Sequence, residues 1–147
     1  MSAYTTIVVG TDGSESSLKA VDRAGALAGD SATLVIACAY FPNDRGSGGA
    51  ADVLKDEAYQ IQGSSPTEEI LRTAKERAAR AGAAKTDLRS VKGAPVDALM
   101  QLVGDTKADL LVVGNKGLNS IAGRLLGSVP ADVARKSACD VLIVHTT

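Results

Sequence analysis

Residues 110–128 read LLVVGNKGLNSIAGRLLGS and combine a predicted strand with an unusual loop. The stretch opens with the unbroken aliphatic run Leu110–Val113, which is typical of a strand buried on both faces of a sheet. The loop that follows spans far more residues than the two to six that usually join a strand to the next helix. The stretch therefore predicts a buried strand whose following loop has a function of its own.

Similar aliphatic runs recur through the chain, at Ile7–Val9, Leu34–Ala37 and Val141–Val144, with a weaker, alternating run at 86–91. Between the runs, apolar residues follow helical spacing. The positions with that spacing are Leu18, Val21 and Gly25, then Ile70, Leu71, Ala74, Ala78 and Ala81, then Val96, Leu99, Met100 and Val103. Alternating strands and helices predict an α/β fold with an open parallel sheet, right-handed crossovers and ligands bound outside the carboxyl ends of the strands.

Helix boundaries follow from capping residues. Ser65–Glu68 reads as a capping box, and Pro95 is expected at the first position of a later helix. Gly82 and Gly104 are predicted helix ends. A last short helix is expected over 128–136, because Pro130 is tolerated only in a first turn.

The chain has the size of one domain, covering residues 1–147. It contains 147 residues, 45% of them apolar, as is usual for a single globular core. Residues 41–64 are too long and too rich in glycine for an ordinary connection, so we expect a flexible or lid-like insertion there.

Charge and composition exclude several function classes. A formal net charge of -1 and 3% aromatic residues argue against nucleic-acid binding, which needs a basic field or stacking rings. No apolar run is long enough to span a membrane, and the amino terminus is polar, so a cytoplasmic protein is expected. Cys38, Cys139 and His145 are too scattered for a zinc site or a catalytic cysteine-histidine pair, and small buried thiols are expected.

The loop after Leu110–Val113 suits a phosphate group. No acidic residue occurs from 110 to 131, whereas Lys116 and Arg124 are present. Gly117 and Gly127 allow successive amides to point into one concavity at the start of the last helix. The loop is neither a Walker motif, since no Gly-Lys pair is followed by Ser or Thr, nor a dinucleotide fingerprint, since GxGxxG does not follow the first strand.

The glycines instead form the pattern G-x2-G-x9-G-[ST], and the chain begins its first strand and turn with IVVGTDGS. With these two motifs the chain resembles the universal stress protein family over essentially its whole length. The resemblance implies a single-domain, Rossmann-like fold with five parallel strands in the order 3-2-1-4-5 and helices on both faces. It also implies the nucleotide-binding branch of the family, with ATP or cyclic AMP as ligand, and a homodimer formed through the last strand, Val141–Val144.

The resemblance assigns the roles of the site residues. Asp12 is similar to the aspartate that contacts the ribose hydroxyls or a phosphate-bound Mg²⁺; its alternative role is a helix N-cap. The backbone of Ala39 would read the adenine edge, with Gly10 and Thr11 beside the base, and Gly114 would let the ribose approach the strand end. The expected phosphate contacts are Lys116, Gly117, Gly127, Ser128 and the amide of Val129.

Two departures from the family pattern affect these roles. Many relatives have Arg or His at the position of Lys116, and lysine cannot grip a phosphate in a bidentate manner. The family's Cys-Pro before the last strand is Cys139-Asp140 here, and Pro130 follows Val129 where Ser or Thr is common. These changes bear on dimer geometry more than on nucleotide binding.

Binding rather than turnover is the expected role, in a stress response or in signalling. No residue near the motif supplies a general base, so no catalytic residue is assigned and any ATP hydrolysis should be slow. An adenylating enzyme is the alternative, but it would need SGGxDS where this chain has TDGSESS at 11–17. A phospho-receiver domain would need clustered acids after the first strand, a phospho-acceptor Asp after the third and a Lys after the fifth, and of this set only Asp12 is available. The sequence leaves the choice between ATP, with Mg²⁺, and cyclic AMP open.

Overall fold

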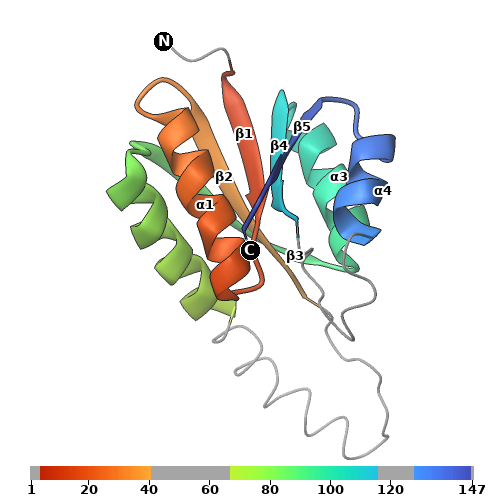
Figure 1. The fold of residues 1–147 in the computed structure, drawn as a ribbon, viewed down its shortest axis with the longest axis horizontal. Helices are drawn as coiled ribbons and strands as arrows, with labels where there is room; N and C mark the ends of the chain where they lie inside the picture. Colours follow the sequence, from red (N-terminus) through yellow and green to blue (C-terminus); the bar gives the residue numbers. More distant parts are fainter. Residues whose placement is uncertain (1–3, 41–66, 116–127, 147) are drawn as a thin grey trace, which may run out of the picture.

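The computed structural model describes residues 4–40, 67–115 and 128–146 (Figure 1). The predicted insertion at 41–64 and the capping box at Ser65–Glu68 therefore lie outside the described residues, apart from the end of the box. The described elements are β1 (Thr6–Gly10), α1 (Glu15–Ala28), β2 (Thr33–Tyr40), a helix over 67–81, β3 (Lys85–Lys92), α3 (Pro95–Thr106), β4 (Leu110–Gly114), α4 (Ser128–Lys136) and β5 (Asp140–Val144).

The five strands form one parallel sheet in the order β3-β2-β1-β4-β5, as predicted. β1 is central, and it pairs with β2 from Thr6↔Thr33 and with β4 from Ile7↔Leu110. Because all strands run in one direction, their last residues lie at one end of the sheet, which we call the carboxyl end. β3 and β5 are the two outer strands.

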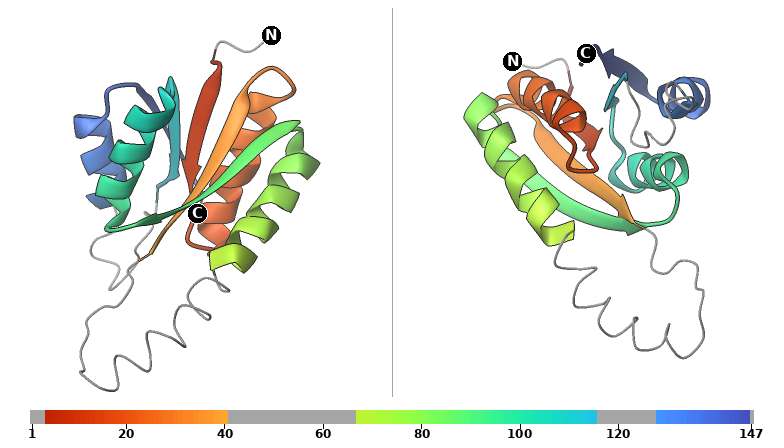
Figure 2. Two further views of the ribbon diagram at one scale, coloured as in Figure 1. Left: turned by 180° about the vertical axis from the view of Figure 1, so that it is seen from behind. Right: turned by 60° about the horizontal axis from the view of Figure 1, so that its bottom comes forward.

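Helices cover both faces of the sheet, which explains the unbroken aliphatic runs (Figure 2). Side chains alternate between faces along a strand. Ile7 and Val9 pack with α1 and the helix over 67–81, whereas Val8 packs with α3 and α4. The two clusters are a core divided by the sheet, so every central strand position must be apolar.

The observed helix boundaries confirm some predictions and correct one. α3 begins with Pro95 in its first turn, and the helix over 67–81 ends at Gly82, whose φ is +127°. The prediction that Gly104 ends a helix is wrong, because α3 continues to Thr106. Its cap is Lys107, a residue with a side chain in the left-handed region at φ 57°, and the Lys107 N–H donates to the Gly104 carbonyl at 3.3 Å.

α1 and the helix over 67–81 approach each other closely. Gly25 is buried in α1 and faces Ala78. Beside this contact, the Arg77 guanidinium donates two hydrogen bonds to the Asp22 carboxylate, at 3.0 and 2.7 Å. Glycine therefore allows a separation between the two helices that a larger residue would not permit.

Asp109 joins the amino ends of β1 and β4. Its carboxylate accepts hydrogen bonds from the Thr5 N–H at 3.0 Å, the Thr6 N–H at 3.0 Å and the Thr5 hydroxyl at 3.1 Å. Partial burial acts to raise the pKa of Asp109, but the hydrogen bonds from Thr5 and Thr6 outweigh it, so that the pKa lies below its ordinary value.

Asp109→Asn is expected to destabilise the protein at neutral pH by about 1 kcal/mol, because the amide has one acceptor oxygen for three donors. A lowered folded-state pKa contributes stability above the unfolded pKa of about 4, and this contribution is lost as the pH falls through the folded-state value. Urea unfolding at a series of pH values should therefore show the parent and the variant converging in acid. Asp105→Asn, at an exposed position in α3, is the control and should show no such convergence. A constant difference between parent and Asp109→Asn at all pH values would contradict this account.

Candidate functional site

The structure brings five of the predicted site residues to the carboxyl end of the sheet. Gly10 ends β1 and is followed by Thr11 and Asp12, Ala39 lies near the end of β2, and Gly114 ends β4. These three strands are neighbours in the sheet. Lys116, Gly117 and Gly127 lie outside the described residues. Ser128 and Val129 form the start of α4, as predicted, and only their backbone is described.

The turn between β1 and α1 is held by the hydroxyl of Thr11. The Thr11 N–H donates to the Ala37 carbonyl at 2.9 Å, which extends the pairing of β1 with β2 by one residue. Its side chain is buried, and its hydroxyl lies 2.7 Å from that of Ser17 while accepting the Gly13 N–H at 3.1 Å. Because the Ser17 hydroxyl donates to the Ser14 carbonyl, Thr11 is the donor to Ser17. The Thr11 side chain therefore shapes the turn, and its backbone remains the part that would lie beside a base.

Asp12 is not the N-cap of α1. That position belongs to Ser14, whose side chain accepts the Ser17 N–H at 3.1 Å. The Asp12 Oδ1 atom accepts the Ser14 N–H at 2.9 Å, and the residue is exposed. The turn thus orients the Asp12 carboxylate at the carboxyl end of the sheet while leaving it accessible to solvent.

The thiol of Cys38 lies in β2 close to this turn. Burial raises the pKa of Cys38 to about 11, and the negative charge of Asp12 adds to the effect. The thiol is protonated at neutral pH and is a poor nucleophile. The prediction of a buried thiol is confirmed for Cys38, but it is wrong for Cys139, which is only partly buried because it precedes the outer strand β5.

Gly114 is buried between β4 and neighbouring segments. A Cβ atom added there would lie 3.4 Å from the Thr146 methyl group and 3.7 Å from the Ser16 carbonyl oxygen. These are ordinary contact distances, so alanine would fit, but a branched side chain would press on Thr146. A large substitution at Gly114 would consequently disturb the protein as well as any ligand.

Within residues 4–40, 67–115 and 128–146, no three His, Cys, Asp or Glu side chains are grouped so that they could hold a metal ion. None of the helices in these ranges is long and apolar enough to cross a membrane.

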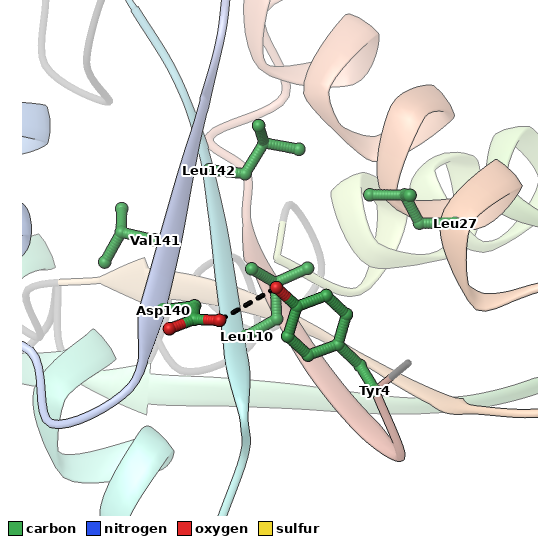
Figure 3. A pocket seen from close by; sticks show the side chains of 6 residues that line it. All are labelled: Tyr4, Leu27, Leu110, Asp140, Val141 and Leu142. Carbon is green, nitrogen blue, oxygen red and sulfur yellow. Dashed lines mark hydrogen bonds between the residues drawn. The ribbon is translucent and has the colours of Figure 1, made fainter. Parts of the chain in front are cut away.

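A groove of about 430 Å³ lies at the opposite end of β4 and β5 (Figure 3). Its lining residues are Tyr4, Leu27, Leu110, Asp140, Val141 and Leu142. The Tyr4 hydroxyl donates to Asp140 Oδ2 at 2.8 Å, and this contact raises the pKa of Tyr4. The groove has no contiguous pattern in the sequence, because its walls come from four separate segments; the aliphatic run Val141–Val144 is the one signal that points to it.

Comparison with known proteins gives consistent matches. The family model described as the universal stress protein family matches residues 3–145. A universal stress protein of Mycobacterium tuberculosis (strain ATCC 25618 / H37Rv) is 61% identical over 147 residues, which is the full length of both chains.

Solved structures agree with the sequence matches. A crystal structure of a universal stress protein in complex with cAMP is 57% identical, with a TM-score of 0.78, over 99% of this chain and 100% of the other. A universal stress protein from Archaeoglobus fulgidus, in complex with dAMP, covers 95% of this chain and 97% of its own at a TM-score of 0.65. At 18% identity, the second structure supports the fold alone.

Proposed function

The chain belongs to the universal stress protein family, and on that basis we propose that it binds an adenine nucleotide, cyclic AMP or ATP, at the carboxyl end of the sheet. The observation that carries the proposal is its 57% identity, over nearly the full length, to a family member crystallised with cAMP. The protein would act as a binding module in a stress response or in signalling.

The described part of the site supports this proposal. Gly10 and Thr11 offer backbone groups at the end of the central strand, beside Ala39 at the end of β2. The amino terminus of α4 lies at Ser128 and Val129, and a helix amino terminus carries the partial positive charge and the backbone amides that favour a phosphate. We assign Lys116, Gly117 and Gly127 to the same phosphate site from their place in the glycine motif.

Binding without efficient turnover is part of the proposal. General-base catalysis needs a titratable group near the reacting phosphate. On the described turn, the Asp12 carboxylate is anchored to the Ser14 N–H, and the neighbouring Cys38 thiol is protonated. Slow ATP hydrolysis remains the second candidate, to be tested by phosphate release.

Calorimetry with ATP and cyclic AMP, each with and without Mg²⁺, tests the function. Cyclic AMP carries one phosphate charge and is expected to bind without the metal. ATP is expected to bind better with Mg²⁺, and Asp12→Ala should weaken that binding about tenfold, equivalent to about 1.4 kcal/mol, while changing cyclic AMP affinity little.

Asp12→Asn is the matched control for the fold of the turn, because its amide oxygen can still accept the Ser14 N–H. The asparagine variant should show the same tenfold weakening of Mg²⁺-dependent ATP binding, to about the level of Asp12→Ala, but keep the parent's melting temperature. The proposed function would be rejected if neither ATP nor cyclic AMP bound at millimolar concentration. Binding of only one nucleotide would identify it as the ligand.

We also propose that two copies associate through β5. It is an outer strand, and Ile143 exposes 42% of its surface there. Val141 and Leu142 are only half-buried and line the groove that contains Asp140. An apolar outer strand with free backbone groups on one side favours pairing with a second strand.

A further inference from the structure

Thr146 is a buried polar residue that no part of the proposed site yet explains. It follows β5 and is only 6% exposed. Its N–H donates to Asn115 Oδ1 at 2.8 Å, and its hydroxyl donates to the same oxygen at 2.9 Å. The hydroxyls of Thr146 and Ser16 are also hydrogen-bonded. The side chain thus connects the first residue after β4 to the first turn of α1.

In the cluster of Ser16, Asn115 and Thr146, each hydroxyl donor has an acceptor. A carboxamide oxygen has two acceptor sites, and Thr146 fills both. Since the Thr146 hydroxyl proton is directed to Asn115, the Ser16 hydroxyl must be the donor to Thr146. The hydroxyl protons of Ser16 and Thr146 therefore each have one direction, which favours a single orientation of the Asn115 side chain.

Three further contacts fix the same segment. The Asn115 N–H donates to the Val144 carbonyl at 2.8 Å, so that β4 and β5 remain paired up to the start of the glycine motif. The Lys19 ammonium lies 3.5 Å from the Thr146 carbonyl oxygen. The Thr146 methyl group lies 3.4 Å from the position of a Cβ atom at residue 114, so it limits the side chain there to one no larger than alanine. The segment that follows β5 therefore packs directly against the residues that end β4, at the carboxyl end of the sheet.

We propose that Thr146 is a positioning residue of the nucleotide site, acting through Asn115. It holds the chain where it leaves β4 and ties that point to α1, whose preceding turn carries Asp12. Thr146 itself does not touch the nucleotide. This inference rests on the proposed function for its ligand, but the hydrogen-bonded arrangement is a property of the protein alone.

Two substitutions separate the hydroxyl from the shape of the side chain. Thr146→Val keeps the branched shape and removes the hydroxyl, whereas Thr146→Ser keeps the hydroxyl. Thr146→Val is expected to weaken cyclic AMP binding about fivefold, through loss of the hydroxyl's hydrogen bond to Asn115, and Thr146→Ser should bind like the parent. Adenosine, which has no phosphate, should bind equally to all three, because Asn115 begins the segment assigned to the phosphate.

The results distinguish positioning from general loosening. Equal cyclic AMP affinity in the parent and in Thr146→Val would overturn the inference, as would an equal loss of adenosine affinity. Melting temperatures of both variants identify any loss of folded protein. Should Thr146→Val not fold, Asn115→Ala replaces it, with the same expected losses.

Amide hydrogen exchange provides a measurement that needs no ligand. The Asn115 N–H should exchange faster in Thr146→Val than in the parent, because the Asn115 side chain has lost its hydrogen bond from the Thr146 hydroxyl. If the parent binds no nucleotide, the proposed function fails, while faster exchange at Asn115 still supports the positioning role. Unchanged exchange would overturn that role whatever the binding result.

Discussion

Gly25→Ala is expected to lower the free energy of unfolding by about 2 kcal/mol or more, because the added Cβ atom has no room. It would lie 2.7 Å from the Ala78 carbonyl oxygen, 3.1 Å from the Ala78 Cα atom and 3.2 Å from the Ala81 Cβ atom. Two of these are backbone atoms, so relief requires a shift of the whole helix over 67–81. Such a shift would also disturb the contacts of Arg77 with Asp22.

Gly104→Ala is the matched control for this prediction. Gly104 also lies inside a helix, but among the described residues no atom outside its own stretch of helix backbone and its two chain neighbours lies within 4 Å of the position its Cβ would occupy. Alanine should stabilise α3 there by about 0.5 to 1 kcal/mol, through helix propensity. Urea unfolding of both variants gives the comparison. A loss of stability in Gly104→Ala, or no loss in Gly25→Ala, would contradict the packing described for these helices.

Ile143→Lys is expected to convert the proposed dimer into a monomer. In a dimer paired through β5, the lysine would place two like charges in an apolar contact, and the dissociation constant should rise about a hundredfold or more. Sedimentation velocity at micromolar concentration distinguishes the 14.9 kDa chain from a species of twice that mass.

Leu88→Lys provides the control at the opposite side of the sheet. Leu88 is exposed to 36% and lies in β3, the other outer strand. This substitution should leave the dimer intact. A parent that sediments as a monomer would reject the dimer, and dissociation caused equally by both substitutions would show that β5 is not the interface.

The sheet could be predicted because its strands carry their own signal. Ile7–Val9 and Leu110–Val113 are aliphatic at every position, as burial on both faces requires. β3 gave only an alternating run, because it is an outer strand with polar residues such as Lys85 and Arg89 exposed. The sequence predicts the end of α3 at Gly104 because glycine is the usual residue at a left-handed helix end. The prediction is wrong because Lys107 adopts the left-handed conformation instead.

The candidate site was predictable only in part. Asp12 and Gly114 follow strands, so a parallel sheet places them at the same end. The contacts of Thr146 have no such pattern, since it is 130 residues from Ser16 in the sequence and 31 from Asn115. The Tyr4 contact with Asp140 likewise joins residues 136 positions apart. No local periodicity encodes such pairs, which depend on the finished fold.

The central place of β1 has a consequence for synthesis on the ribosome. One side of β1 pairs with β2, which is made soon afterwards, but its other side pairs with β4, beginning at Leu110. A nascent chain that has already joined β1 to β2 therefore carries an unpaired aliphatic edge, Ile7–Val9, until most of the protein has been translated. Closing that gap requires a contact of high sequence separation, which is slow to form. The edge of β1 is covered only after β4 has left the exit tunnel and has paired with it.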